Sequence, residues 1–446
     1  MAMNEPHPKP PVAAVRLHPV ASAHGVRSDP YYWLRDDDRT NPQVLAYLEA
    51  ENAYLERCTA AHKPFENALY EEIVARLKQD DAGVPYRKHG YWYNSRYEPG
   101  KEHLLFVRRR DAPDAPEEVI LDANALAAGH DYYQVGALEV SPDCAWLAFC
   151  EDTVGRRQYT LRFKNLLSGE ILQTAIADVE SDLAWANDSR TLLYVEKDPE
   201  TLLGLYVKKH VLGTDPRQDA LAFEQKDRSF YTGVSKSKSD RFIFIHMEST
   251  VSSEWRYAHA DDPLLEFKTF LPHERDHEYQ VEHLGGAFIV RTNWRARNFR
   301  LMQVPIGREG SRAEWQNVVA HRDDTFIEDF DVFNGFLALS VRSGGLAKIS
   351  ITLLAADSAM PNVAHPPMPR IAVPTPGAAA SAAAVQGAVA AQGAVAVQGA
   401  ADFYIASDEA AYATSLSVNS ELDTDWVRYE YQAMIDAVID YGPIER

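Results

Sequence analysis

Strand-like segments that lead through a turn into a second strand recur along the middle of this chain at a nearly constant interval. The segments begin at Leu138, Leu183, Val234, Tyr279 and Phe330, so successive starts are 45, 51, 45 and 51 residues apart. Each interval has room for about four short strands. A period of roughly 40–50 residues with one four-stranded sheet per repeat is typical of a β-propeller.

Two further segments of the same texture extend the repeat in both directions. One begins near residues 86–93, and the other occupies residues 412–418. Counting both gives about seven units, which is within the usual range for propellers. We therefore predict an all-β fold, a seven-bladed β-propeller over residues 81–446 with an α-helical N-terminal arm. The sequence leaves open whether the last blade is complete.

The first 80 residues have a different pattern. Residues 1–27 are polar and rich in proline and are expected to form a flexible lead, followed by a helical arm over residues 28–80. Asn41 is a suitable N-cap, and Pro42 suits the first helical position. Apolar residues then recur at helical spacing, with a break near Lys63, at Val44, Leu45, Leu48, Leu55, Phe65, Leu69, Ile73 and Leu77. Because these stripes need a partner surface, we expect a sticky or mobile arm where that partner is missing.

One segment interrupts the repeat. Residues 374–401 consist almost entirely of Ala, Val, Gln and Gly, and a Gln-Gly pair recurs every six positions. The uncharged run allows a membrane helix as one interpretation, but alanine is only weakly apolar and the repeated Gln and Gly interrupt every helical face. We favour a low-complexity insertion in a blade loop, because long surface insertions add little loop-closure entropy.

Composition narrows the classes of partner. The chain has 446 residues, of which 46% are hydrophobic and 25% charged, so wholesale disorder is excluded. Its formal net charge of −20 argues against a nucleic-acid partner, which would require a basic face.

Three cysteines, Cys58, Cys144 and Cys150, are too few for a disulfide framework and are interpreted as reduced thiols. Residues 1–20 lack the apolar segment of a signal peptide. We expect a cytoplasmic protein without a membrane partner.

One motif resembles a zinc peptidase site. His273, Glu274 and His277 match the H-E-x-x-H pattern, and His283 is a candidate third ligand. The pattern binds zinc only when a helix places both imidazoles on one face. Pro272 precedes the motif and a strand-like run follows it, so we favour a charged turn between two blades.

Other catalytic signals are weak. The sequence contains no G-x-S-x-G, no P-loop and no G-x-G-x-x-G. Arg295, Arg297 and Arg300 form a local basic patch beside aromatic residues that could bind an acidic group, although an ordinary surface turn is favoured. We therefore predict no catalytic, cofactor-binding or metal-binding residue in this chain, and no cofactor.

Several longer motifs resemble one enzyme family. Residues 29–36 (Asp-Pro-Tyr-Tyr-Trp-Leu-Arg-Asp), with the Glu and Asn residues at 49–52, resemble the N-terminal segment of the prolyl oligopeptidase family. Residues 139–143, 275–279, 291–299 and 419–429 are closer to the oligopeptidase B group, also called protease II. The similarity covers nearly the whole chain except the lead, the insertion and the last ten or so residues.

The resemblance implies a cytosolic serine peptidase in two parts. In this family a seven-bladed propeller caps an α/β-hydrolase domain and restricts entry to short peptides, and oligopeptidase B cleaves after Lys or Arg. The Ser, Asp and His of the triad lie in the hydrolase domain, whereas this sequence stops at Arg446. No catalytic residue can be carried over, so we expect the chain alone to be inactive.

The implied partners are therefore short basic peptides and a hydrolase domain, with no nucleic acid and no membrane. Two alternatives stay open at this point. One is a stand-alone propeller that binds a peptide or protein, and the more remote one is a zinc peptidase using His273, Glu274 and His277.

Overall fold

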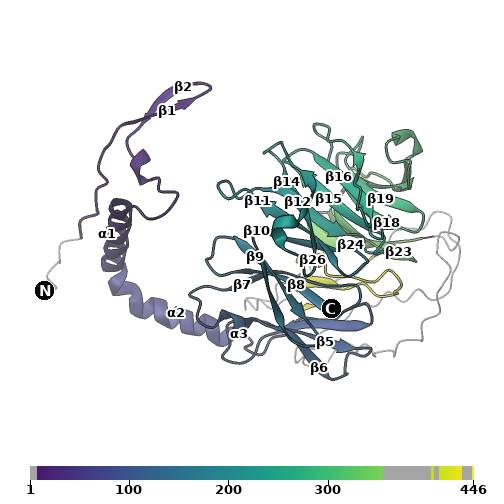
Figure 1. Cartoon of the computed structure of the whole chain (residues 1–446), viewed down its shortest axis with the longest axis horizontal. Coiled ribbons are helices and arrows are strands. Elements are labelled where there is room, and N and C mark those ends of the chain that lie inside the picture. Colours follow the sequence, from purple (N-terminus) through teal and green to yellow (C-terminus); the bar gives the residue numbers. More distant parts are fainter. Residues whose placement is uncertain (1–7, 355–402, 406–410, 434–443, 446) are drawn as a thin grey trace. The chain divides into compact units, whose positions relative to one another are not determined.

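The computed structural model describes residues 8–354, 403–405, 411–433 and 444–445 (Figure 1). The predicted insertion at residues 374–401 lies outside these described residues. The chain divides into two compact units, one ending at Gln79 and the other starting at Asp80. None of the described helices combines the length and the apolar character that crossing a membrane requires.

The N-terminal unit contains a hairpin and a helical segment. Its elements are β1 (His18–Ser22), β2 (Gly25–Asp29), η1 (Tyr32–Leu34), α1 (Pro42–Thr59), η2 (Ala60–His62) and α2 (Lys63–Arg76). The Asn41 side chain accepts a 3.0 Å hydrogen bond from the backbone N–H of Gln43, and Pro42 occupies the first turn of α1. The helix therefore starts where the sequence predicted. The Asn41 side chain satisfies one backbone N–H group of the first turn, and Pro42 has no N–H group that would need a partner.

The two helices of this unit bury little of their apolar surface. Within α1 and α2, Val44 alone is buried, whereas Leu55 and Ile73 are 59% and 52% exposed. The apolar stripe read from the sequence therefore exists as an exposed face in this unit.

The second unit consists of consecutive antiparallel meanders, which we number as blades. Blade 1 contains β3 (Tyr86–Lys88), β4 (Tyr91–Arg96), β5 (Leu105–Arg110) and β6 (Glu117–Asp122), followed by the short helix α3 (Ala123–Ala127). Blades 2 and 3 share one sheet, formed by β7 (Gln134–Val140), β8 (Trp146–Asp152), β9 (Tyr159–Asn165), β10 (Ile171–Trp185), β11 (Thr191–Lys197), β12 (Gly204–Val211) and β13 (Ala220–Glu224), with η3 (Pro216–Gln218) before β13.

Blades 4 to 7 follow the same plan. Blade 4 contains β14 (Tyr231–Lys236), β15 (Phe242–Glu248), β16 (Ser253–His259) and β17 (Lys268–Leu271). Blade 5 contains β18 (Tyr279–Leu284), β19 (Ala287–Thr292), β20 (Arg300–Pro305), η4 (Arg312–Glu314) and β21 (Gln316–Val319). Blade 6 contains β22 (Thr325–Val332), β23 (Phe336–Ser343), β24 (Leu346–Leu353) and β25 (Phe403–Tyr404), and blade 7 contains β26 (Tyr412–Leu416), β27 (Tyr429–Ala433) and β28 (Ile444–Glu445).

The long strand β10 explains why two blades share a sheet. Its first part pairs with β9, from Ile171 to Val179, and its last part pairs with β11, from Val179 to Trp185. Register shifts interrupt both pairings, as expected where a strand bends from one blade into the next. The shared sheet therefore counts as two blades, and the predicted seven-bladed propeller with its helical arm is confirmed.

Apolar packing joins each blade to the next. Six buried clusters link blades 1 and 2, 2 and 3, 3 and 4, 4 and 5, 5 and 6, and 6 and 7. Among the described residues, no such cluster and no strand pairing joins blade 7 to blade 1. That junction carries an ion pair between Arg87 and Glu421, at 3.5 Å.

The cluster between blades 4 and 5 has an aromatic centre. The Phe288 ring is fully buried and lies 5.0–5.3 Å from the rings of Phe242, Tyr257 and Phe270. We predict that Phe288→Ala lowers the free energy of unfolding by about 3–5 kcal/mol, because it removes a large buried side chain and leaves a cavity. Urea unfolding followed by far-ultraviolet circular dichroism measures this loss. Tyr231→Ala, at a 71% exposed position in β14, is the matched control and should change stability by less than about 0.5 kcal/mol.

The exposed helical face gives a second prediction. Replacing both Leu55 and Ile73 by Lys should reduce binding of the dye ANS to this chain, because ANS reports exposed apolar surface. The propeller should keep its unfolding midpoint in urea, since neither residue belongs to it. Unchanged ANS fluorescence in the double variant would show that the dye binds elsewhere.

Candidate functional site

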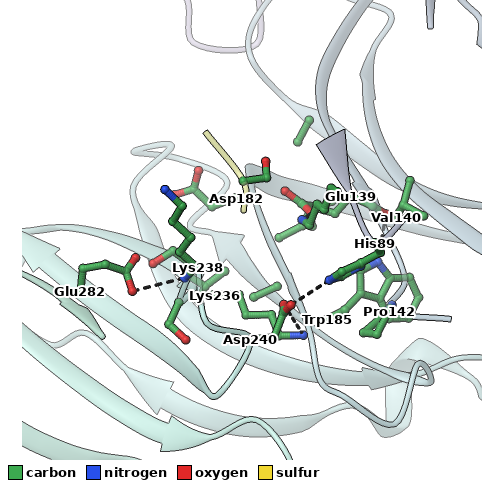
Figure 2. A pocket seen from close by; sticks show the side chains of 18 of the residues that line it. His89, Glu139, Val140, Pro142, Asp182, Trp185, Lys236, Lys238, Asp240 and Glu282 are labelled. Carbon is green, nitrogen blue, oxygen red and sulfur yellow. Dashed lines mark hydrogen bonds and ion pairs between the residues drawn. The ribbon is translucent and has the colours of Figure 1, made fainter. Parts of the chain in front are cut away.

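A cavity of about 390 Å³ is lined by residues from all seven blades (Figure 2). In every blade the lining residues lie in the first strand or directly after it, including Lys88, His89, Glu139, Asp182, Trp185, Lys236, Lys238, Asp240, Glu282, Asp331 and Asn419. A point reached by the first strand of every blade must lie on the propeller axis, so the first strands are innermost and the cavity is the central channel.

Strand alternation places charged groups in this channel. In β18, Val281 and His283 are buried, whereas Glu282 between them lines the channel. Successive strand residues point to opposite faces of a sheet, so a single register supplies both the packing between blades and the channel wall.

Ion pairs connect blades that are not neighbours in sequence. The Nε2 atom of His89 in blade 1 lies 2.7 Å from Oδ2 of Asp240 in blade 4. Lys236 reaches the same carboxylate at 3.3 Å (Figure 2). The hydrogen bond to Asp240 raises the pKa of His89 to about 9, so its ring is a cation at neutral pH and Nε2 donates to the Asp240 carboxylate.

Two more pairs involve other blades. Lys88 lies 3.3 Å from Glu139, which joins blades 1 and 2. Lys238 lies 2.8 Å from Asp331, which joins blades 4 and 6. Burial lowers the pKa of Lys238 and raises the pKa of Asp331, because both charged forms lose water in the channel wall.

Two carboxyl groups in the channel make no ion pair among the described residues. Glu282 accepts backbone hydrogen bonds from His283, at 2.6 Å, and Lys238, at 3.2 Å, but makes no ion pair. Asp182 makes neither a hydrogen bond nor an ion pair within the described part of the chain. Burial raises the pKa of Asp182 to about 6 and the pKa of Glu282 to about 7.

Gly233 allows Asp182 to approach strand β14. A Cβ atom at residue 233 would lie 2.5 Å from Oδ2 of Asp182 and 2.3 Å from the ring of His246. Any larger residue would displace these side chains, so the glycine leaves the space in which the Asp182 carboxyl lies against the inner strand.

The zinc interpretation lacks the geometry that it requires. Residues 273–277 form a turn rather than a helix, and His277 is buried with Nε2 at 2.9 Å from Thr292 and Nδ1 at 3.0 Å from Arg312. Glu274 pairs with Arg312 at 2.6 Å. Among the residues that the structure describes, no group of three His, Cys, Asp or Glu side chains is placed to hold a metal ion.

The channel residues were not identified from the sequence. A signal for them was present, because a charged residue directly follows an apolar one near the end of the first strand of several repeats, as at Glu139, Glu282 and Asp331. The basic patch at Arg295, Arg297 and Arg300 lies outside the channel, at the β19–β20 turn.

The raised pKa of Asp182 has a consequence for stability. Between about pH 4 and pH 6 the unfolded chain releases this proton and the folded chain retains it, so its contribution to stability falls as the pH rises through that window. We predict that Asp182→Asn increases the free energy of unfolding by about 1–2 kcal/mol at pH 7.5 and leaves it unchanged at pH 4. Urea unfolding at the two pH values measures the difference. Asp114→Asn, at an exposed turn, is the control and should have no effect at either pH.

Comparison with known proteins is consistent with this architecture. The family model for the prolyl oligopeptidase N-terminal β-propeller domain matches residues 10–435. Dipeptidyl aminopeptidase BI of Pseudoxanthomonas mexicana is 44% identical over 97% of this chain and 56% of its own length. Protease 2 of Moraxella lacunata is 31% identical over 76% of this chain and 50% of its own length.

Solved structures agree with the fold. Oligopeptidase B from Leishmania major superposes with a TM-score of 0.82 at 24% identity, covering 95% of this chain and 57% of that one. Oligopeptidase B from Trypanosoma brucei gives 0.79 at 23% identity, with the same coverage. The chain spans about half the length of these relatives. The resemblance read from the sequence motifs is confirmed, and the chain belongs to the prolyl oligopeptidase family, whose N-terminal β-propeller domain it contains.

Proposed function

We propose that this propeller selects substrates for a serine peptidase of the oligopeptidase B type, which cleaves short peptides after Lys or Arg. The observation that carries the proposal is the pair of channel carboxyls, Asp182 and Glu282, that make no ion pair among the described residues. A Lys or Arg side chain entering the channel would supply the missing charge and form charge-assisted hydrogen bonds.

The size of the channel supports selection by shape. A cavity of about 390 Å³ is within the range of small-ligand pockets, and the ion pairs between blades 1 and 4 and between blades 4 and 6 form part of its wall. A short extended peptide fits such a space, whereas a folded protein does not.

Bond cleavage is not part of the role proposed for these 446 residues. Acyl transfer requires a nucleophile, a base and an oxyanion hole in one constellation, and the sequence contains no G-x-S-x-G. We propose that a hydrolase domain is the partner that performs the chemistry. A cytoplasmic location is part of the same proposal, supported by the free thiols of Cys58, Cys144 and Cys150.

The names of the relatives favour a second candidate activity. One relative is named a dipeptidyl aminopeptidase and the other a protease. An enzyme that releases dipeptides must recognise the α-amino group of its substrate, which is also a cation. The carboxyls of Asp182 and Glu282 are suited to either cation, so the test must separate a basic side chain from a free amino terminus.

The proposal predicts peptide binding without cleavage by this chain. A labelled pentapeptide with a central Arg should bind with a dissociation constant that rises at least about tenfold in Asp182→Asn/Glu282→Gln, because each lost charge-assisted bond contributes about 1.5–3 kcal/mol. Fluorescence anisotropy in low salt measures binding, and a fluorogenic ester or amide after Arg reports cleavage. Asp114→Asn/Glu314→Gln, which changes the same charge at exposed positions, is the matched control.

The choice of peptide separates the candidates. Replacing Arg by citrulline should abolish binding if the side chain is recognised, whereas acetylating the amino terminus should abolish it if the α-amino group is recognised. Equal binding of all peptides by the wild type and the channel variant would refute the proposal and favour a stand-alone propeller with another ligand surface. Cleavage by the chain alone would also contradict it.

A further inference from the structure

A cluster of arginines surrounds one tryptophan, Trp294, in the connection between β19 and β20 of blade 5. The guanidinium carbons of Arg295, Arg300 and Arg312 lie 5.0, 5.1 and 5.4 Å from the ring centroid of Trp294. Each contact is within the range of a cation–π interaction, so one indole ring holds three cations in a small space.

The charges in this cluster are not balanced. Arg312 is paired with Glu274 at 2.6 Å. Arg300 bonds only the neutral side chain of Asn317, at 3.3 Å, and Arg295 makes no ion pair or hydrogen bond among the residues that the structure describes. Burial and then the nearby charge of Arg295 lower the pKa of Arg300, which is the expected effect of like charges held together.

The turn that carries the cluster is fixed by its own packing. The backbone N–H of Ala296 donates to the carbonyl of Asn293 at 2.9 Å, and that of Phe299 donates to Ala296 at 2.8 Å. The side chains of Ala296 and Phe299 are buried, and the Phe299 ring lies 3.7 Å from the guanidinium of Arg291. Arg295 therefore extends from an anchored turn, and binding a ligand there would cost little backbone entropy.

We propose that Arg295 and Arg300, supported by Trp294, form a binding site for a doubly charged oxyanion of the phosphate class. Two guanidinium groups without carboxylate partners leave two positive charges, and their planar N–H forks match the oxygens of a phosphate group. A dianion neutralises both charges at once, whereas a single carboxylate neutralises one. The proposal is independent of the channel function, because no channel residue takes part.

Arg297 does not belong to this site, although the sequence analysis grouped it with the other two. Its guanidinium lies 3.1 Å from Asp323, and both side chains are largely exposed. It is an ordinary surface arginine of the kind that the sequence analysis favoured for the whole patch, and it provides a matched control in the same turn.

The test measures binding of inorganic phosphate to the whole chain by isothermal titration calorimetry in low-salt buffer at pH 7.5. The wild type should bind phosphate at one site, and Arg295→Gln should weaken binding at least about tenfold, as expected for losing a charge-assisted bond. Arg297→Gln removes the same charge two residues away and should bind like the wild type. Because Arg295 is exposed, its replacement should not disturb folding, unlike that of the half-buried Arg300.

One further ligand identifies the source of the phosphate group. A phosphoserine peptide that binds more tightly than inorganic phosphate would identify a phosphorylated protein segment as the source, and the reverse order would identify a small free phosphate. Equal binding of phosphate by the wild type and Arg295→Gln, or equal heats from chloride at the same ionic strength, would overturn the proposal.

Discussion

Apolar packing between consecutive blades is the interaction on which the rest of this structure depends. Each blade is a local meander that packs against its neighbours in sequence, and six buried clusters form these contacts. The same strands that pack outward through residues such as Val281 place Glu282 and its equivalents toward the axis. The channel is therefore a consequence of the packing register, since a one-residue slip in an inner strand would exchange its core and channel faces.

The charged groups of the channel, unlike the apolar core, contribute little to the stability of the fold. Paired charges such as Lys238 and Asp331 contribute little net stability, because the loss of water offsets most of their attraction. Their effect is geometric, since His89 with Asp240 and Lys238 with Asp331 connect blades that share no apolar cluster. Asp182 contributes unfavourably once it is ionised, because its carboxyl lacks a partner among the described residues. A group that lowers stability in a cavity is a candidate for function rather than for folding.

Much of the fold could be predicted from the sequence, because a repeat of about 45–51 residues leaves few architectures available. The sharing of β10 between two blades was not predicted. A signal for it was present, since residues 173–182 contain neither Gly nor Pro to end the strand that starts at Ile171.

The channel residues were harder to predict from the sequence, because His89 and Asp240 are 151 residues apart and meet only once the ring has formed. The zinc motif is the opposite case, because here the sequence suggests a site that the structure does not provide. Its spacing matches H-E-x-x-H, but the residues lie in a turn, and Thr292 and Arg312 already bond both ring nitrogens of His277.

The net charge of −20 and the local charges act at different ranges. The overall field attracts cations and repels polyanions, but at physiological salt it is screened within about 8 Å. What binds at a given place therefore depends on the unpaired groups there, which are carboxyls at Asp182 and Glu282 and guanidiniums at Arg295 and Arg300. A long polyanion lying along the surface would come within that distance of many acidic groups while gaining only two cations, so the second site favours small or singly phosphorylated ligands. An acidic protein can thus hold one site for cations and another for a small anion, with the partners of each set by local pairing.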